Sequence, residues 1–487
     1  MATQCAVMSK RKRGTEEGAS TVGNRGEQGS KLQNLQTFLS WLEKEGARWP
    51  KVEFKHSDEW GWHALVKQGE TICANEEIIS LPNELCINSI SVESDVAFGP
   101  AAASLKSKTM KSSPDEFDED TLDRASVCAY IAYQIWLPNS RWRPYFDLVP
   151  GLEEGFEENV GVWLTNKSKA SLLKGTHLGM CVVPEFGRTH DLMFNRFVIP
   201  LFSALGKDVS EPTFATVLRR TFRWAAALYF SRAILVPYPS NTSFGFQKSR
   251  SSKSYETITP LIDLLNHRPG TLSAMKHNAR PNVTGGNILY SNGRTLKSGE
   301  QIFLNYGPRS NEDLLAHFGF TLRDNMCDTA IVHLGFPGKN QGPSYKLFRG
   351  GGIPEAMLNA VRLQLAPKPT AAAVPASTVY RIPATFVGSS EWLASLSSPT
   401  DGEGSKVEVD FDRIGSTISS ENEMAILNWI KETCRAQICL ATAGGRDDEG
   451  DSFCQNVQNY TDGIVAVLND ACAYVDKLMS YLDKPAC

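Results

Sequence analysis

The sequence lacks the features that mark a membrane, nucleic-acid-binding or metal-binding protein. No apolar run approaches the about 18 residues of a membrane-spanning helix. The formal net charge is -4, so no general positive field exists to hold a nucleic acid. The 11 cysteines form no CxxC pair, and neither they nor the 8 histidines have a zinc-binding spacing. We expect a soluble cytoplasmic or nuclear protein with reduced thiols, no metal, no membrane contact and no nucleic-acid partner.

Common catalytic motifs are absent as well. The chain contains no Walker A sequence, no GxSxG elbow, no HExxH motif and no Gly-rich dinucleotide loop after a strand. At 487 residues it is long enough for two or three domains with a substantial core.

The first 30 residues are Gly-, Ser- and Glu-rich, and we expect a disordered leader there. The basic run Lys10–Arg13 has two interpretations, a nuclear-import signal or a solvated tail. Three acidic residues in the same leader argue against an organelle transit peptide: Glu16, Glu17 and Glu27.

Apolar periodicity predicts helices on both sides of a β-rich region. A short helix is predicted over 32–45, strands and turns over 60–88, and mostly helix over 121–237. The clearest helix runs from Phe214 to Ala233, where apolar residues recur at helical spacing. A polar, Ser-rich stretch at 241–253 predicts a loop.

Strand signals return over 258–320, with a hairpin turn predicted at Asn292-Gly293. After a Gly/Pro-rich stretch, helical patterns resume over 422–439 and 457–482. The α+β organisation we predict is a β-rich core at 31–325, with a helical insert at about 121–240. A separate α-helical domain is predicted over 335–487.

Two segments carry the most specific pattern. They are TPLIDLLNHRPG (Thr259–Gly270) and GEQIFLNYGPRSNEDLLAHFGF (Gly299–Phe320). Together they resemble the two motifs of the SET-domain protein methyltransferases, in which an Asn-His pair and a Tyr-Gly sequence meet at a knot-like crossing beside S-adenosylmethionine (SAM). Both motifs occur in order, about forty residues apart.

Three upstream segments extend the resemblance: SRWRPYFDLVP (140–150), LLKGT (172–176) and WAAALYFSRA (224–233). They are similar to the subgroup typified by Rubisco large-subunit methyltransferase and the actin-histidine methyltransferases. This resemblance spans about residues 35–480. It implies a SET core with a pseudo-knot, an insert within that core, and a helical C-terminal domain that docks the protein substrate.

The chemistry of SAM indicates which side chains form its pocket, because SAM carries a carboxylate, an amino group, a sulfonium and an adenine. Arg232 suits the carboxylate. Asn266 and His267 suit the amino-acid and adenine portions, and Phe318 and Phe320 suit the adenine ring. Asp263, in the first of the two motif segments, is the remaining candidate from these segments for the SAM pocket.

Tyr306 is the candidate catalytic residue. Its hydroxyl and neighbouring carbonyls can align the nucleophile with the methyl group, and positioning is the main catalytic effect available. A lysine amine near a sulfonium in a poorly solvated channel should have a lowered pKa, which frees its lone pair.

One stretch departs from the family pattern. The family's N-terminal SAM loop reads Gly-x-Gly, whereas this chain has EWGWHAL (59–65), with His63 where the second glycine is expected. A side chain there would crowd the cofactor, so an inactive member is an alternative. Trp60, Gly61 and Trp62 are the candidate contacts.

Several of these residues also have structural interpretations. Asp263 and Asn266 suit a turn cap and His267 a core position. A capping box explains Ser310 with Asp313. Side-chain packing explains the aromatic cluster of the 140–150 segment: Trp142, Pro144 and Tyr145.

The function predicted from all of this is SAM-dependent N-methylation of a non-histone protein by a monomeric enzyme. Ile234, two residues beyond Arg232, is apolar and offers no hydrogen bond to an imidazole, which favours lysine as acceptor. The alternatives are a protein-histidine methyltransferase and a catalytically silent SET-fold interaction protein.

Overall fold

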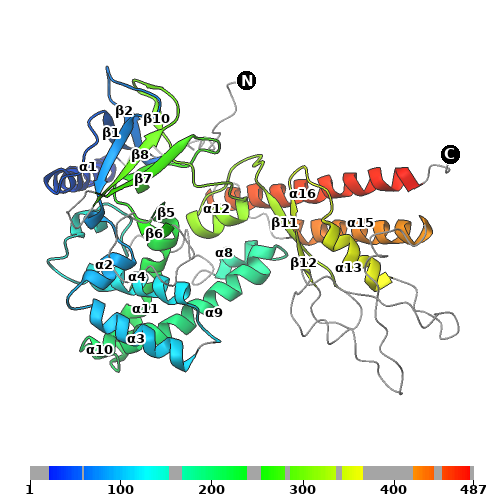
Figure 1. Cartoon of the computed structure of the whole chain (residues 1–487), viewed down its shortest axis with the longest axis horizontal. Helices are drawn as coiled ribbons and strands as arrows, with labels where there is room; N and C mark the ends of the chain where they lie inside the picture. The colour runs from blue at the N-terminus through cyan, green and yellow to red at the C-terminus, as the bar shows by residue number, and fades with distance from the viewer. Residues whose placement is uncertain are drawn as a thin grey trace. The chain divides into compact units, whose positions relative to one another are not determined.

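The computed structural model describes residues 21–57, 60–113, 115–152, 167–237, 254–279, 286–335, 343–365, 420–443 and 452–482. The chain forms two compact units. The core unit comprises residues 1–172, 178–321 and 446–457, and the C-terminal unit comprises 173–177, 322–445 and 458–487. Figure 1 labels their elements. The basic run at 10–13 and the predicted loop at 241–253 lie outside the described residues.

The core unit contains several small antiparallel sheets. One has the order β1 (Val52–Ser57), β2 (Gly61–Val66) and β10 (Gln301–Ile302). A second has the order β4 (Glu77–Pro82), β8 (Gly286–Asn292) and β7 (Ser273–Ala279). Two-stranded pairs join β3 (Thr71–Ile72) to β9 (Leu296–Lys297) and β5 (Ala233–Pro237) to β6 (Ser254–Ile258). Strands from before and after the insert therefore share each of the first two sheets (Figure 1).

Helices occupy the chain between β4 and β5. They are α2 (Ser89–Ser94), α3 (Gly99–Ser112), α4 (Glu119–Ile135), α5 (Arg143–Phe146), α8 (Lys167–Leu172), α9 (Val183–Met193), α10 (Ile199–Ala204) and α11 (Pro212–Arg232). The π-helical turns η3 (Leu178–Val182) and η4 (Phe194–Val198) flank α9, and short 3-10 turns lie at η1 (Asn83–Leu85) and η6 (Ile262–Leu264). The prediction of a helix over 214–233 is confirmed by α11.

The helical insert begins near residue 89, so the predicted start near 121 is wrong. Local signals explain the earlier start: the Asn88 side chain accepts from the Ser91 amide at 3.0 Å and begins α2 with a capping box. Pro100 lies in the first turn of α3, where its missing N–H costs nothing.

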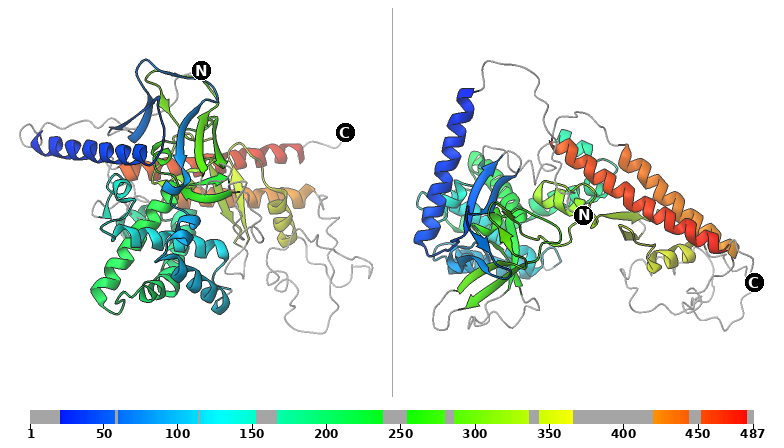
Figure 2. Two further views of the ribbon diagram at one scale, coloured as in Figure 1. Left: turned by 60° about the vertical axis from the view of Figure 1, so that its left-hand side comes forward. Right: turned by 90° about the horizontal axis from the view of Figure 1, so that it is seen from above.

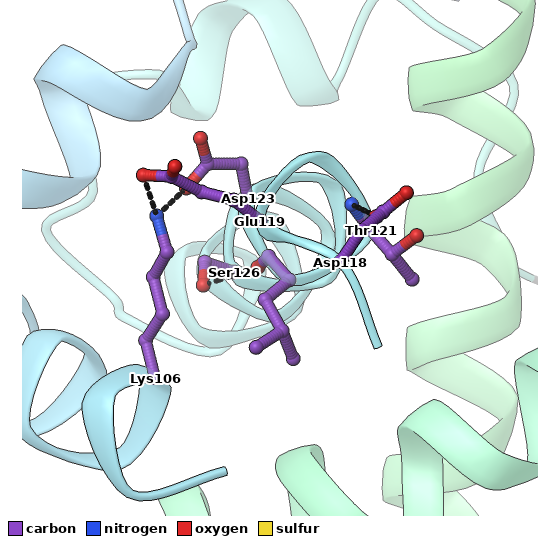
Figure 3. Close-up of polar contacts among 7 residues, drawn as sticks. Lys106, Asp118, Glu119, Thr121, Asp123 and Ser126 are labelled. Atoms are coloured by element: carbon purple, nitrogen blue, oxygen red, sulfur yellow. Dashed lines mark hydrogen bonds and ion pairs between the residues drawn. The ribbon is translucent and has the colours of Figure 1, made fainter. Parts of the chain in front are cut away.

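Polar contacts fix the start of α4 against α3 (Figure 3). The Asp118 carboxylate accepts from the Thr121 amide at 2.7 Å, which caps the helix. The Lys106 ammonium of α3 pairs with the carboxylates of Glu119 and Asp123 on α4. The helix then buries most of its length, and α4 packs on α11.

The N-terminal helix α1 spans Thr21–Lys44, so the prediction that residues 1–30 are all disordered is wrong for 21–30. Leu35, Phe38 and Leu42 are buried in the core. A helix anchored by such residues extends at low cost, because each further residue adds one backbone hydrogen bond.

The hairpin predicted at Asn292-Gly293 is also wrong. The chain does turn there, with the Gly293 amide donating to the Leu272 carbonyl, but the flanking strands belong to different sheets. β8 pairs with β4 and β7, whereas β9 pairs with β3. Local turn chemistry fixes the bend but not the strand partners.

The C-terminal unit is mainly helical, with α13 (Glu355–Leu365), α15 (Ser420–Thr442) and α16 (Ser452–Leu482). The latter two confirm the predicted helices, and they lie side by side in Figures 1 and 2. The unit also contains an antiparallel pair, β11 (Thr329–His333) and β12 (Ser344–Phe348), which the all-helical prediction missed. Apart from the short segment 173–177, this unit begins at residue 322 and not at the predicted 335. Among the described helices, none is long and apolar enough to cross a membrane.

A glycine in α16 tests the packing of the C-terminal unit. A Cβ at Gly463 would lie 2.1 Å from the Asp328 Oδ2 atom, and Asp328 is buried. Gly-to-Ala changes in helices usually stabilise by about 1 kcal/mol. We predict instead that Gly463→Ala lowers the free energy of unfolding by about 1–3 kcal/mol, because the buried carboxylate must move.

Urea unfolding followed by circular dichroism measures this effect. In an Asp328→Ala background the same glycine substitution should be neutral or stabilising, because the obstructing carboxylate is gone. A stability gain from Gly463→Ala in the otherwise unchanged chain would contradict the prediction.

Candidate active site

The two motif segments meet through backbone hydrogen bonds. The Leu304 amide donates to the Asn266 carbonyl at 2.9 Å, and the Arg268 amide donates to the Leu304 carbonyl at 3.1 Å. His267 and Leu304 thus form a parallel bridge. Segments about forty residues apart in sequence lie side by side, as the motifs predict.

A cavity of about 510 Å³ opens beside this crossing. Nine of the ten predicted cofactor residues line it: Trp60, Gly61, Trp62, Arg232, Asp263, Asn266, Tyr306, Phe318 and Phe320. They come from loops and elements spread over more than 250 residues of the sequence. The fold therefore gathers the predicted set into one place.

His267 is the predicted residue that does not line the cavity. It is buried, and its ring stacks on Tyr306 with 4.9 Å between centroids. Burial lowers the pKa of His267, so its imidazole is neutral near pH 7. The neutral Nδ1 atom accepts a hydrogen bond from the Tyr306 amide at 3.1 Å. His267 therefore holds the backbone and the ring of Tyr306 without lining the cavity itself.

Tyr306 is held at both ends of its side chain. Its hydroxyl donates to the Leu265 carbonyl at 2.9 Å, and its ring lies 4.9 Å from that of Phe318. Burial raises the pKa of Tyr306 to about 12, although the charge of Arg232 acts in the opposite direction. The phenol is therefore a fixed, protonated group at neutral pH.

Arg232 and Asp263 form a buried pair on the cavity wall. Arg232 ends α11, where its Nη1 donates to the Asp263 carbonyl at 3.2 Å and lies 3.5 Å from the carboxylate Oδ2. Burial raises the pKa of Asp263, and Arg232 and Tyr145 act against that shift. Within the described part of the chain, neither Asp263 Oδ1 nor Arg232 Nε has a hydrogen-bond partner. Both atoms are enclosed, so the hydrogen bonding of this pair is incomplete.

Asn266 ties the crossing to the N-terminal loop. Its side-chain amide donates to the carbonyls of Trp60 and Trp62 at 3.2 and 3.3 Å. Gly61 between them has φ +59°, a conformation that favours glycine. His63 does not line the cavity, and its Nδ1 atom lies 3.0 Å from the Gly61 carbonyl. His63 is thus placed outside the cavity lining, as expected where successive strand residues alternate in direction, and its effect on cofactor binding stays a prediction.

The short helix α12 (Asn311–Phe318) places the two phenylalanines. The predicted capping box is confirmed: the Asp313 amide donates to Ser310 Oγ at 3.2 Å, and the Ser310 amide donates to the Asp313 carboxylate at 3.3 Å. Gly319 ends the helix with φ +74°. Phe318 and Phe320 flank that turn and line the cavity.

Sequence reasoning missed a second group of lining residues. These come from the middle of α1, from β1 and from the segment after α5: Ser30, Lys31, Asn34, His56, Asp147, Leu148, Val149 and Pro150. Three carbonyls of that last segment accept hydrogen bonds, from Asn34, Trp62 and Trp224. The 140–150 motif was the available signal, but it was interpreted as packing.

The chain was compared with known proteins. It is 26% identical over 206 residues to the actin-histidine N-methyltransferase of Drosophila melanogaster, covering 40% of this chain and 35% of that protein. It is 30% identical over 297 residues to the ribosomal lysine N-methyltransferase set11 of Schizosaccharomyces pombe, covering 61% and 63%. It is 24% identical over 206 residues to the N-lysine methyltransferase SETD6 of Homo sapiens, covering 42% and 40%.

The chain thus spans between about a third and just under two thirds of these relatives' lengths. No family profile matches the chain. Among solved structures, the SET domain of LSMT bound to lysine and AdoHcy matches with a TM-score of 0.64 at 16% identity, covering 93% of both chains. Rubisco LSMT bound to AdoMet matches with a TM-score of 0.61 at 16% identity, covering 92% and 93%.

Both the α+β fold and the resemblance to the suspected subgroup are thereby confirmed: the chain has the SET-domain fold of Rubisco LSMT, and the proteins similar to it in sequence are named as lysine and actin-histidine methyltransferases.

Proposed function

We propose that this protein is a SAM-dependent protein N-methyltransferase whose acceptor is a lysine side chain on a non-histone protein. The observation that carries the proposal is the convergence of Arg232, Asn266 and Tyr306, from three distant segments, on one cavity. The names of the relatives agree with this chemistry, and one solved neighbour is described as bound to AdoMet.

The residues of the cavity fit SAM. The Arg232 guanidinium, partly exposed on the cavity wall, complements a carboxylate, and the enclosed Asp263 side chain holds that guanidinium in place. Phe318 and Phe320 offer aromatic faces to an adenine. When bound, SAM supplies a methyl group activated by its sulfonium.

The chain's own residues would act by positioning. The Tyr306 hydroxyl, fixed on the Leu265 carbonyl, orients the incoming amine at the cavity wall. Arg232 places a positive charge on that wall, which disfavours a second cation and so favours the neutral, nucleophilic form of the lysine amine. His267 keeps Tyr306 in place through the Tyr306 amide.

Ile234 supports lysine over histidine as the acceptor. It lies on β5, two residues after Arg232, and pairs with Thr257 of β6. Its partly buried side chain has no hydrogen-bonding atom to offer an imidazole, whereas an alkyl-amine stem packs against apolar surface.

We propose that the protein substrate docks on the C-terminal unit. Apolar side chains are exposed there on α15 and α16, including Leu440 at 53%, Tyr474 at 38% and Tyr481 at 57%. Tyrosine is among the residue types that are enriched where proteins bind partners. A cytoplasmic or nuclear location and a monomeric state stay predictions.

The proposal is tested by incubating the purified protein with labelled SAM and fractionated cell extract, and mapping the modified residue by mass spectrometry. Label on a lysine nitrogen is expected. Label on a histidine nitrogen would sink the acceptor assignment, and no protein labelling together with no SAM binding would sink the proposed function.

Replacing the Tyr306 hydroxyl should separate catalysis from binding. We predict that Tyr306→Phe lowers kcat by about a hundredfold, because the amine loses its fixed partner, with less than about a threefold change in SAM affinity. Tyr290→Phe is the matched control, since this buried phenol also donates to a backbone carbonyl, that of Phe303 at 2.5 Å. Equal kcat values for Tyr306→Phe and wild type would show that the Tyr306 hydroxyl has no catalytic role.

The role of Ile234 can be tested by substitutions that change the polarity of its side chain but hardly change its size. Ile234 is not among the lining residues of the cavity, and we propose that it borders the path of the acceptor beyond it. We predict that Ile234→Asn lowers kcat/KM for the lysine substrate by about tenfold, because an amide beside this path loses water without gaining a partner. Ile234→Val keeps the position apolar and should stay within about twofold of wild type. If both variants methylate lysine as wild type does, Ile234 does not line the acceptor path.

The raised pKa of Tyr306 predicts how kcat depends on pH in the alkaline range. A folded-state pKa of about 12, above the ordinary value, keeps the phenol protonated as pH rises through 10. We predict that kcat rises as the acceptor amine loses its proton and then stays level up to about pH 10.5. Steady-state rates in matched buffers measure this, with circular dichroism confirming the fold. A decline centred near the pKa of an ordinary tyrosine, about 10, would contradict it.

A further inference from the structure

Tyr145 is a buried residue whose hydroxyl group, in addition to its ring, makes a specific contact. Its side chain is fully buried in α5, with the rings of Phe38 and Phe146 6.1 and 5.9 Å away. Packing of this kind requires only a ring, and a phenylalanine would provide it. The hydroxyl instead reaches the Oδ2 atom of Asp263 at 2.5 Å, across 118 residues of sequence. A buried hydroxyl with so specific a partner calls for a polar role.

The partner of Tyr145 lies on the cavity wall. The Asp263 side chain is 0% exposed, and its Oδ2 atom contacts both Tyr145 and Arg232. Its Oδ1 atom has no hydrogen-bond partner among the residues that the structure describes. Because the whole side chain is enclosed, Asp263 holds its neighbours Tyr145 and Arg232 rather than contacting a ligand itself.

The direction of the Tyr145 hydrogen bond is fixed by its proton. Burial, together with the negative charge of Asp263, raises the pKa of Tyr145 well above its usual value, although Arg232 acts against this. The phenol therefore remains a donor and the carboxylate an acceptor. With Oδ2 occupied by Tyr145 and Arg232, the carboxylate cannot rotate without breaking both contacts.

We propose that Tyr145 is a positioning residue for cofactor recognition: by holding the enclosed Asp263 through Oδ2, it keeps Asp263 in place to hold the Arg232 guanidinium, which lines the cavity and receives the carboxylate of the cofactor's amino-acid group. This inference rests on the proposed function and deepens it. It assigns selection of the carboxylate end of the ligand to a Tyr145, Asp263 and Arg232 cluster that joins α5, η6 and α11.

Two thioether probes distinguish this role from packing. S-adenosylhomocysteine carries the amino-acid group, whereas 5′-methylthioadenosine has the same adenine and ribose without it. We predict that Tyr145→Phe raises the calorimetric Kd for S-adenosylhomocysteine about tenfold and leaves the Kd for 5′-methylthioadenosine within about twofold. A loss of packing around the cavity would weaken the binding of both probes. The ratio of the two Kd values therefore distinguishes the positioning role from packing.

Tyr130→Phe is the matched control. Tyr130 is also a buried phenol that donates to a carboxylate, Asp95 Oδ2 at 3.0 Å, but neither residue lines the cavity. This variant should bind both probes as wild type does. Asp263→Asn provides a second measurement, because this variant should itself raise the Kd for S-adenosylhomocysteine. Adding Tyr145→Phe to Asp263→Asn should raise that Kd by less than about a further twofold, because the two side chains act as one unit.

The outcomes are distinct. Unchanged binding of S-adenosylhomocysteine by Tyr145→Phe overturns the inference, as does an equal loss of both probes or full additivity with Asp263→Asn. A wild-type protein that binds neither probe overturns the proposed function itself. A selective loss of the amino-acid-bearing probe supports both.

Discussion

The crossing of the two motif segments is the constraint on which the site depends. Two backbone hydrogen bonds join Leu304 to Asn266 and Arg268. Each contributes only about 0.5–1.5 kcal/mol net, so they fix the register more than they supply the stability. Burial of the neighbouring Leu265 and Ile302 supplies the rest of the force that holds the segments together. A register shift of one residue would exchange Asn266 with its neighbour and turn its amide away from the N-terminal loop.

The buried charges of the cavity have to be understood as a functional rather than a stabilising feature. Buried ion pairs seldom repay the desolvation of both partners, and an incompletely paired one repays less. The Arg232 and Asp263 pair is incomplete, with Oδ1 and Nε lacking partners in the described ranges. A core that tolerates this arrangement gives up folding stability, and a ligand whose carboxylate binds Arg232 would stabilise the folded state in return.

The motifs and the helical periodicity could predict which residues meet, because both depend on short spacings in the sequence. The predicted helix ending near Arg232 and the capping box before Phe318 are local features of this kind. The partner of each strand could not be predicted: β2 pairs with β10, more than 230 residues away. For the same reason sequence reasoning missed that α1 lines the cavity, that His267 lies behind Tyr306, and that His63 faces away from the ligand site.

The ionisation states of the site decide which kind of catalysis it can support. Tyr306, with a pKa raised to about 12, cannot accept a proton near neutral pH, and its hydroxyl is already committed to the Leu265 carbonyl. His267 is neutral, but its Nδ1 atom is occupied by the Tyr306 amide. Neither group is therefore a base for an incoming ammonium. In the proposed reaction the amine would therefore lose its proton to solvent before or during entry, and the positive charge of Arg232 at the wall would favour that loss. Methyl transfer would then be accelerated by alignment on rigid groups, which is why a site so poor in free proton acceptors can still suit this reaction.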